Sequence, residues 1–268
     1  RRVLFRSVQT MTKIQLALIQ TALAWEDREA NVDHFGALLE QACGADLIIL
    51  PEMFSTGFSM NSKELAEPVS GQTMTWLQHK AVELDSTLTG SFIAEDKGQY
   101  YNRGFWVAPK APPRFYDKRH LFRMSGEHES YSPGNGRQQF ELKGFNICLQ
   151  ICYDLRFPIF SRNIGNAYDL LIYVANWPAA RRTQWRTLLQ ARAIENQSFV
   201  VGLNRIGEDG NGVQYAGDSL VVCPEGDLLL DTESREGVFL TTLELEPMQA
   251  YRARFPAWMD QDQVVLET

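Results

Sequence analysis

Three strand-like runs, far apart in the chain, each end in an ionisable side chain, and this pattern constrains the fold most. Residues 46–51 (Asp-Leu-Ile-Ile-Leu-Pro) are followed by Glu52, residues 114–117 by Lys118, and residues 145–151 by Cys152. Short apolar runs bounded by polar and turn-forming residues are typical of buried strands. The sequence therefore predicts an α/β fold whose buried strands deliver a carboxylate, an amine and a thiol to a pocket.

A thiol at the end of a buried strand is a candidate nucleophile, but it needs other side chains to activate it. At neutral pH a free cysteine is only a few per cent thiolate, so its proton must be removed by a base. An attack on a carbonyl group also needs a donor that stabilises the oxyanion. Glu52 and Lys118 are the residues that the chain offers for these two tasks.

The order Glu, Lys, Cys, each closing a strand, resembles the pattern of the nitrilase superfamily of carbon–nitrogen hydrolases. The matching segments are residues 50–54 (Leu-Pro-Glu-Met-Phe), 116–122 (Tyr-Asp-Lys-Arg-His-Leu-Phe) and 151–158 (Ile-Cys-Tyr-Asp-Leu-Arg-Phe-Pro). The three residues are spaced 66 and 34 positions apart, as this family leads one to expect. The resemblance extends from about residue 13 to the C-terminal region, and three linked motifs are more specific than any one of them.

The resemblance implies a role for each residue. Glu52 would take the thiol proton, and the sulfur of Cys152 would attack an amide carbonyl to give a tetrahedral intermediate. Lys118 and the backbone N–H of Tyr153 would hold the oxyanion. Glu52 would then protonate the departing ammonia and activate the water that hydrolyses the thioester. For this cycle we expect Glu52 to lie in a largely apolar pocket.

Glu127 is the candidate for a second glutamate, because it lies seven residues before Gly134 in the loop that precedes the nucleophile strand. Related sequences carry a glutamate there, which implies that Glu127 orients Lys118 or the substrate. Glu129 is close enough to take the same place. The alternative is that Glu127 is an ordinary solvated loop residue.

Arg156, four residues after Cys152, stands where family members that act on small carboxylate-bearing amides place an arginine. A guanidinium clamps a carboxylate with two parallel N–H bonds, so an anionic linear amide is the expected substrate. The alternative for Arg156 is a structural salt bridge to Asp154 or another nearby acid. Phe58 and Trp177 are expected to wall the pocket, unless they pack only in the core.

Segments 152–158, 173–178 and 191–197 resemble the branch of the superfamily that contains bacterial ω-amidases. Those enzymes hydrolyse the terminal amide of α-ketoglutaramate and α-ketosuccinamate. Deaminated glutathione amidase, N-carbamoyl amino acid hydrolase and nitrilase are the alternatives within the superfamily. Deaminated glutathione amidase also recognises an α-keto acid, whereas true nitrilases usually have longer chains.

Two hypotheses come from other classes of protein. A cysteine peptidase needs a histidine partner for its thiol, and His120 and His128 lie in the segment between Lys118 and residue 136. A catalytically silent homologue that serves binding or assembly is the second, although intact Glu52, Lys118 and Cys152 argue against loss of function.

Strand-like and helix-like segments alternate along the chain. Strands are predicted at 14–20, 46–50, 87–94, 101–107, 145–151, 169–175, 198–204, 214–223, 228–231 and 237–245, and helices at 28–43, 74–84, 157–163 and 181–196. This pattern fits two sheets packed face to face and covered by helices, the four-layer αββα sandwich of the nitrilase family. No Pro-, Gly- or Ser-rich linker divides residues 11–268, so one domain is expected. Residues 1–10 precede Met11 without periodicity, and we predict that they are a non-native extension.

Composition excludes several classes of function. The formal net charge of −7 and the pI near 5.2 disfavour nucleic-acid binding, and no apolar run approaches the roughly 20 residues of a membrane span. The four cysteines show no zinc-site spacing, and neither a metal nor another cofactor is expected. A reactive thiol fits the reducing cytoplasm. The resemblance further implies a homodimer, formed through helices near Phe157 and Arg192.

Overall fold

The computed structural model describes residues 11–262, so the prediction for residues 1–10 lies outside the described part of the chain. Its first sheet has the strand order β15-β1-β2-β4-β5-β6, with the short β3 paired to β4. The strands β1, β2 and β4 run parallel, and β15, β5 and β6 are antiparallel to their neighbours. The bounds are β1 (Lys13–Gln20), β2 (Leu47–Ile49), β3 (Glu67–Pro68), β4 (Thr87–Asp96), β5 (Gln99–Val107), β6 (Arg114–Asp117) and β15 (Gly237–Glu244).

The second sheet has the order β14-β13-β10-β9-β8-β7, with β8, β9 and β10 parallel at its centre. A separate hairpin joins β11 to β12. The bounds are β7 (Gln139–Leu142), β8 (Phe145–Ile151), β9 (Leu170–Ala175), β10 (Phe199–Asn204), β11 (Ile206–Glu208), β12 (Gln214–Ala216), β13 (Leu220–Val222) and β14 (Leu228–Asp231).

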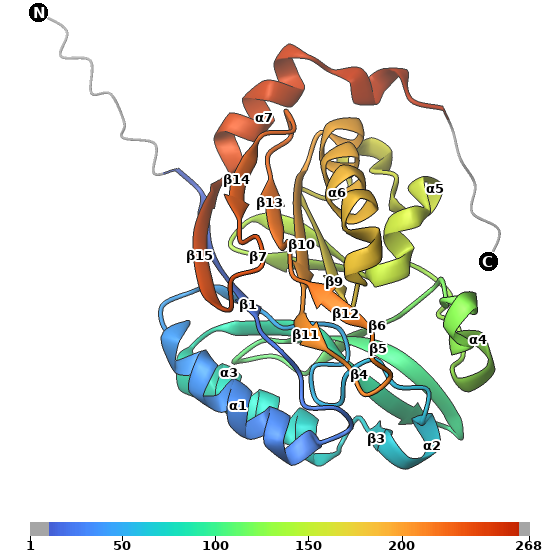
Figure 1. The fold of residues 1–268 in the computed structure, drawn as a ribbon. Helices are drawn as coiled ribbons and strands as arrows, with labels where there is room; N and C mark the ends of the chain where they lie inside the picture. The colour runs from blue at the N-terminus through green and yellow to red at the C-terminus, as the bar shows by residue number, and fades with distance from the viewer. Residues whose placement is uncertain (1–10, 263–268) are drawn as a thin grey trace, which may run out of the picture.

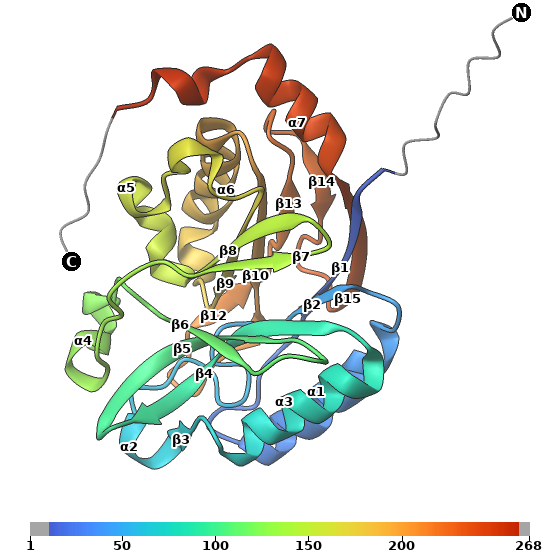
Figure 2. The same cartoon turned by 180° about the vertical axis from the view of Figure 1, so that it is seen from behind.

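Helices cover the outer face of each sheet, as Figures 1 and 2 show. On the first sheet α1 (Arg28–Gln41) and α3 (Gln72–Leu84) bury Phe35 and Leu77 in a core with Ile48. On the second, α6 (Arg182–Asn196) packs Leu189 so closely on β10 that a Cβ at Gly202 would lie 2.3 Å from it. The remaining helices are α2 (Ser62–Leu65), α4 (Glu127–Ser130), α5 (Pro158–Ser161) and α7 (Leu245–Arg254), with 3₁₀ turns at η1 (Arg123–Ser125), η2 (Cys152–Arg156), η3 (Ile164–Asn166), η4 (Ala179–Arg181) and η5 (Ala257–Asp260).

The inner faces of the two sheets pack against each other. Leu16 and Ile49 of the first sheet share one buried cluster with Leu149 and Ile151 of the second. Alternate residues of a strand point to opposite faces, which is why Ile48 packs under the helices while its neighbour Ile49 faces the other sheet. The predicted αββα sandwich is confirmed.

Most predicted strands and helices are present within a few residues, but one strand prediction is wrong. The run 214–223 forms two strands in different sheets, β12 and β13, because the chain turns at Gly217 and Asp218, both with positive φ. The helix α7 and the edge strand β7 were not expected. The long polar connection after Lys118 carries η1 and α4.

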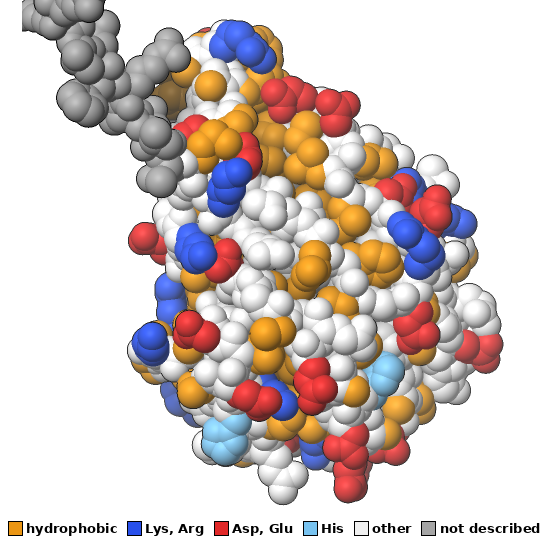
Figure 3. Space-filling view, turned by 90° about the vertical axis from the view of Figure 1, so that its left-hand side faces the viewer, with side chains coloured by type: hydrophobic (Ala, Val, Ile, Leu, Met, Phe, Trp, Pro, Cys, Tyr) orange, Lys and Arg blue, Asp and Glu red, His pale blue; other side chains and the backbone are white. Residues whose placement is uncertain are grey.

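The edge strands β14 and β15 lie on the face shown in Figure 3, where apolar side chains are interspersed with acidic and basic ones. Leu228, Leu229 and Leu240 of these strands are exposed. Between residues 11 and 262, no helix has the length and apolar character needed to cross a membrane.

Candidate active site

The structure brings the ends of three strands together. Glu52 follows β2 and Lys118 follows β6 in the first sheet, and Cys152 follows β8 in the second. The Nζ atom of Lys118 lies 2.8 Å from Oε1 of Glu52. Asn176, which follows β9, links the two sheets: its N–H donates to Oε2 of Glu52 at 2.7 Å, and its carbonyl oxygen lies 3.9 Å from Sγ of Cys152.

Lys118 is the centre of a buried cluster that it forms with Glu52 and Glu127. All three side chains are fully buried, and Nζ also donates to the two carboxylate oxygens of Glu127 at 2.9 and 3.0 Å. Burial alone would lower the pKa of Lys118, but the carboxylates of Glu127 and Glu52 more than offset it and hold the pKa above its ordinary value. Lys118 is therefore a fixed cation, suited to stabilise an oxyanion.

Glu52 is buried as expected, but the expectation of a largely apolar surrounding is wrong. Its carboxylate accepts hydrogen bonds from Lys118, from the side chain of Asn102 at 2.7 Å and from the backbone of Asn176. A buried carboxylate normally needs such hydrogen-bond donors, because an unpaired buried charge is costly. The residue after Glu52, Met53, has a left-handed backbone with a φ of 46°.

The structure distinguishes the two candidate glutamates in the loop. Glu127 opens α4 and accepts hydrogen bonds from Lys118, from the N–H of Phe122 and from Asn102. Glu129 has a side chain 77% exposed, and its one ion pair within residues 11–262 is with its neighbour His128 at 3.8 Å. Burial raises the pKa of Glu127, and the ammonium of Lys118 opposes this effect. The solvated-loop alternative describes Glu129, not Glu127.

Cys152 starts the 3₁₀ turn η2 with a φ of 43°, in the left-handed region that non-glycine residues rarely adopt. This turn directs the thiol into the cavity, where the residue is 9% exposed. Burial raises the pKa of the thiol, and the neighbouring carboxylate of Glu52 raises it further, while Lys118 opposes them. In the free protein the thiol is therefore protonated at neutral pH, and attack must be coupled to proton removal.

Asp154 holds the turn that carries Cys152. Its carboxylate accepts from the hydroxyl of Tyr116 at 2.6 Å, from the N–H of Ile151 at 3.0 Å and from the N–H of His120 at 3.0 Å. The ring of His120 also bonds Asp154 and stacks on Phe157. Asp154 forms no salt bridge with Arg156, so that alternative is wrong for the described residues, and His120 serves the turn rather than the thiol.

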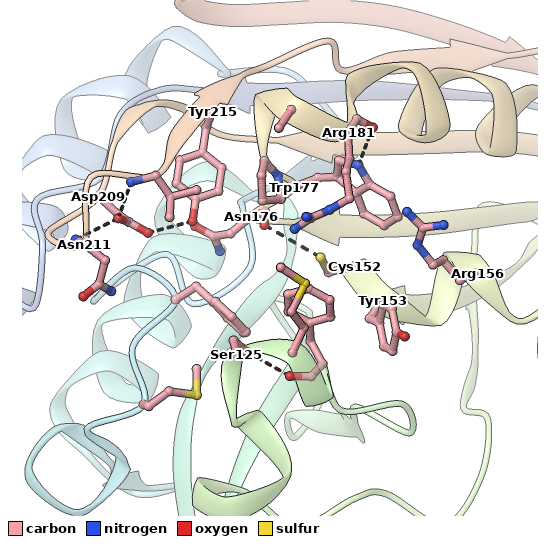
Figure 4. Close-up of a pocket in the computed structure, with 17 residues that line it drawn as sticks. Ser125, Cys152, Tyr153, Arg156, Asn176, Trp177, Arg181, Asp209, Asn211 and Tyr215 are labelled. Atoms are coloured by element: carbon pink, nitrogen blue, oxygen red, sulfur yellow. Dashed lines mark hydrogen bonds between the residues drawn. The ribbon is translucent and has the colours of Figure 1, made fainter.

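A cavity of about 360 Å³ opens above Cys152. It is lined by Tyr153, Arg156, Phe58 and Trp177, the four residues predicted to contact substrate. Figure 4 shows Tyr153, Arg156 and Trp177 around the thiol. The ring of Phe58 lies 5.1 Å from Nζ of Lys118 and so connects the cavity wall to the buried cluster.

Several residues of the site were not predicted. Asn102 and Asn176 bond the carboxylates, and the hairpin between β11 and β12 contributes Asp209, Asn211 and Tyr215 to the cavity wall. Asn176 lies in the segment 173–178 that carried the resemblance, so this signal was present in the sequence. Nothing in the local pattern of Asn102 distinguishes it from other strand residues.

Comparison with known proteins agrees with this geometry. The family model described as carbon-nitrogen hydrolase matches residues 15–253. "Omega-amidase YafV" of Yersinia enterocolitica is 47% identical over 96% of this chain and all of its own length. "2-oxoglutaramate amidase" of Bacillus subtilis is 32% identical over 81% of this chain and 85% of its own.

A solved structure is also similar over nearly the whole chain. It is a CN-hydrolase superfamily protein from Xanthomonas campestris that carries an arsenic adduct in its active site. It is 43% identical, covers 96% of this chain and 100% of its own, and has a TM-score of 0.94. Family model, relatives and fold agree, and the chain belongs to the carbon–nitrogen hydrolase family of the nitrilase superfamily.

Proposed function

We propose that this protein is an ω-amidase, which hydrolyses the terminal amide of small α-keto acid amides such as α-ketoglutaramate and α-ketosuccinamate to the dicarboxylate and ammonia. The relatives named omega-amidase and 2-oxoglutaramate amidase support this substrate class. The observation that carries the proposal is the buried cluster of Glu52, Lys118 and Glu127 beside a thiol, in a cavity that also contains Arg156.

The first half of the reaction forms a thioester. Sγ of Cys152 bonds to the amide carbon while its proton passes to Glu52, and the electron pair of the carbonyl moves to oxygen. The ammonium of Lys118 and the N–H of Tyr153 stabilise this oxyanion. When the oxyanion collapses, the C–N bond breaks, and Glu52 returns the proton to the leaving nitrogen, which departs as ammonia.

The second half releases the acid. Water attacks the thioester carbon and gives its proton to Glu52, which passes it to the departing sulfur of Cys152. Lys118 again stabilises the oxyanion, and its partner Glu127 keeps the ammonium in place without taking part in proton transfer. One carboxylate thus acts as base, acid, base and acid in turn, and the starting state is restored.

Arg156 is proposed to bind the α-carboxylate of the substrate. Within residues 11–262 it forms no salt bridge, and its Cζ lies 5.1 Å from the centre of the Trp177 ring. An arginine stacked on an aromatic ring keeps its N–H donors free for a planar anion. The rings of Phe58 and Trp177 wall the acyl chain.

The rival activities are separated by one experiment. Ammonia release is measured from α-ketoglutaramate, deaminated glutathione, a carbamoyl amino acid and a simple nitrile, with the wild type beside Cys152→Ala. We expect strong preference for α-ketoglutaramate, abolished by the substitution. Preference for deaminated glutathione would keep the mechanism and change the substrate, and activity that survives in Cys152→Ala would overturn the mechanism.

The two hypotheses from other classes have their own tests. A peptidase that used His120 or His128 as the base would lose activity when both are replaced by alanine, whereas the proposed chemistry continues without an imidazole. A silent homologue would release no ammonia from any of the four substrates.

We also propose a homodimer formed through the face that carries α5 and α6. Ile159 of α5 and Ile194 of α6, two neighbouring helices, are 56% and 51% exposed, so a dimer would remove their apolar surface from water. Arg192, expected near this interface, is instead buried and donates to the carbonyl of Leu155. Light scattering should give twice the monomer mass for the wild type and a monomer for Ile159→Glu.

The free thiols agree with a reducing compartment. Cys43, Cys148, Cys152 and Cys223 are all unpaired, and oxidation of Cys152 would remove the nucleophile. We therefore propose that the protein acts in the cytoplasm, which fractionation of cells that express a tagged form would test.

A further inference from the structure

A second arginine, Arg181, lines the same cavity as Arg156. It is the last residue of η4 and the N-cap of α6. Its Cζ lies 5.3 Å from the centre of the Phe122 ring. Figure 4 shows both arginines on the same side of Cys152 as Trp177, with Arg181 reaching from the start of α6.

Arg181 stands out because nothing in the described chain neutralises it. The next two arginines on α6 are paired: Arg182 bonds Asp218, and Arg186 bonds Asp218 and Asp231. The side chain of Arg181 forms no salt bridge or hydrogen bond with residues 11–262. Its hydrogen bonds there come from the backbone: the N–H donates to the carbonyl of Pro178, and the carbonyl accepts from the indole of Trp177.

The position of Arg181 is also unfavourable for a stabilising role. The N-terminus of a helix carries a partial positive charge, so cations are disfavoured there and the N-cap is usually a small polar residue. A cation that helix stability does not explain, and that faces a cavity, is a candidate for ligand recognition.

The one acidic group among the described lining residues is already occupied. Asp209 accepts hydrogen bonds from the N–H groups of Asn211 and Val213 and from the hydroxyl of Tyr215. The cavity therefore presents two free guanidinium groups, Arg156 and Arg181, and no free carboxylate. We call these two residues the arginine pair.

An α-keto acid amide has only one carboxylate, which a single arginine can bind. Its 2-oxo group is a further acceptor, and in a planar α-keto acid this oxygen and one carboxylate oxygen can lie side by side, matching the two parallel donors of a guanidinium. We propose that Arg181 binds this edge and is the residue that selects 2-oxo acid amides, while Arg156 binds the carboxylate. The inference rests on the proposed function and names its specificity residue.

The same position of Arg181 disfavours binding of the parent amino acids. Glutamine has the amide and the carboxylate of α-ketoglutaramate, but a positively charged ammonium replaces the oxo group. Next to Arg181 that ammonium would meet a like charge, which disfavours its binding. Selection thus combines attraction of the oxo acid with repulsion of the amino acid.

The test compares kcat/KM for three amides that differ only at the second carbon: α-ketoglutaramate, glutaramate without the oxo group, and L-glutamine. The variants are Arg181→Gln, Arg156→Gln and, as the matched control, Arg182→Gln. We expect Arg181→Gln to lower kcat/KM for α-ketoglutaramate roughly 10- to 100-fold, the effect of one hydrogen bond to a charged group, with a much smaller loss for glutaramate. Arg156→Gln should lower kcat/KM for all three substrates, and Arg182→Gln should leave kcat/KM unchanged for each of them.

The outcomes separate the inference from the proposed function. A wild type that does not turn over α-ketoglutaramate overturns the proposed function. An active wild type whose preference for the oxo amide over glutaramate is unchanged in Arg181→Gln overturns only the role of Arg181. Thermal unfolding of each variant excludes misfolding as the cause.

The rate at which Cys152 is alkylated tests the same inference without substrate turnover. Iodoacetate and iodoacetamide have similar size and differ in charge, and both alkylate a thiol. We expect Arg181→Gln to slow the labelling of Cys152 by iodoacetate several-fold and to leave labelling by iodoacetamide unchanged, as followed by peptide mass spectrometry. Equal effects on both reagents would contradict an anion-binding Arg181.

Discussion

The site holds charge in two contrasting ways. In the buried cluster of Glu52, Lys118 and Glu127, every charge is fully buried and bonded to another member. The arginine pair, Arg156 and Arg181, is half-exposed, and its members rest on aromatic rings without a carboxylate. In the proposed mechanism, charges that are fixed by one another perform the chemistry, whereas guanidinium groups without a protein carboxylate bind the substrate anion.

Replacing Lys118 by methionine should break the buried cluster most severely. The loss of an oxyanion donor costs about 100- to 1,000-fold in kcat. It also leaves two carboxylates buried without their cation, which should lower the free energy of unfolding by roughly 3–5 kcal/mol. Urea unfolding and ammonia release measure the two effects, and the exposed Lys63→Met is the control. A stable, active Lys118→Met would show that the cluster is not needed.

Replacing Glu127 by glutamine should have a smaller effect on the same cluster. Glutamine keeps the shape but removes the charge that holds the ammonium, and a hydrogen bond to a charged group accounts for roughly 10- to 100-fold. The loss should appear in kcat rather than KM, because Glu127 acts through Lys118. Glu129→Gln, on the same short helix, should behave as the wild type, and equal losses in both variants would contradict the assignment.

These two variants concern residues that the sequence predicted to different degrees. Glu52, Lys118 and Cys152 each close a strand-like run, and their order and spacing carried the family resemblance, so fold and reactive residues could be predicted together. Glu127 was predicted only by its distance from Gly134. The structure separates it from Glu129 because burial, not sequence position, distinguishes a loop glutamate that bonds Lys118 from one that faces water.

The rest of the site depends on contacts between segments that are remote in sequence. Asn102 reaches both carboxylates from the middle of β5, and Arg181 enters the cavity only because α6 packs on β10. No local pattern reports such contacts. The error at 214–223 has a different cause, because the turn at Gly217 and Asp218 divides this run into two strands that join different sheets.

Arg156→Gln tests the arginine pair in the same way that Glu127→Gln tests the cluster. We expect KM for α-ketoglutaramate to rise roughly tenfold or more with a smaller change in kcat, because the lost contact binds substrate and transition state alike. A purely apolar amide, measured in parallel, should be insensitive to the substitution. A fall in kcat alone, with KM unchanged, would mean that Arg156 acts in the chemical step, as the buried cluster does.

The smallest and most diagnostic effect concerns the pKa of the Cys152 thiol. Burial and the carboxylate of Glu52 raise this pKa, so thiolate formation, and with it labelling by iodoacetamide, should keep rising above the pH of about 8.5 at which an ordinary thiol is half ionised. In Glu52→Gln the anion is gone, the pKa falls, and labelling should shift to lower pH although amidase activity is lost. Labelling at a given pH would therefore rise while amidase activity falls, because Glu52 both accepts the thiol proton and repels the thiolate. If labelling of Glu52→Gln instead shifted to higher pH, Glu52 would be stabilising the thiolate indirectly, and the coupled proton transfer would have to be abandoned.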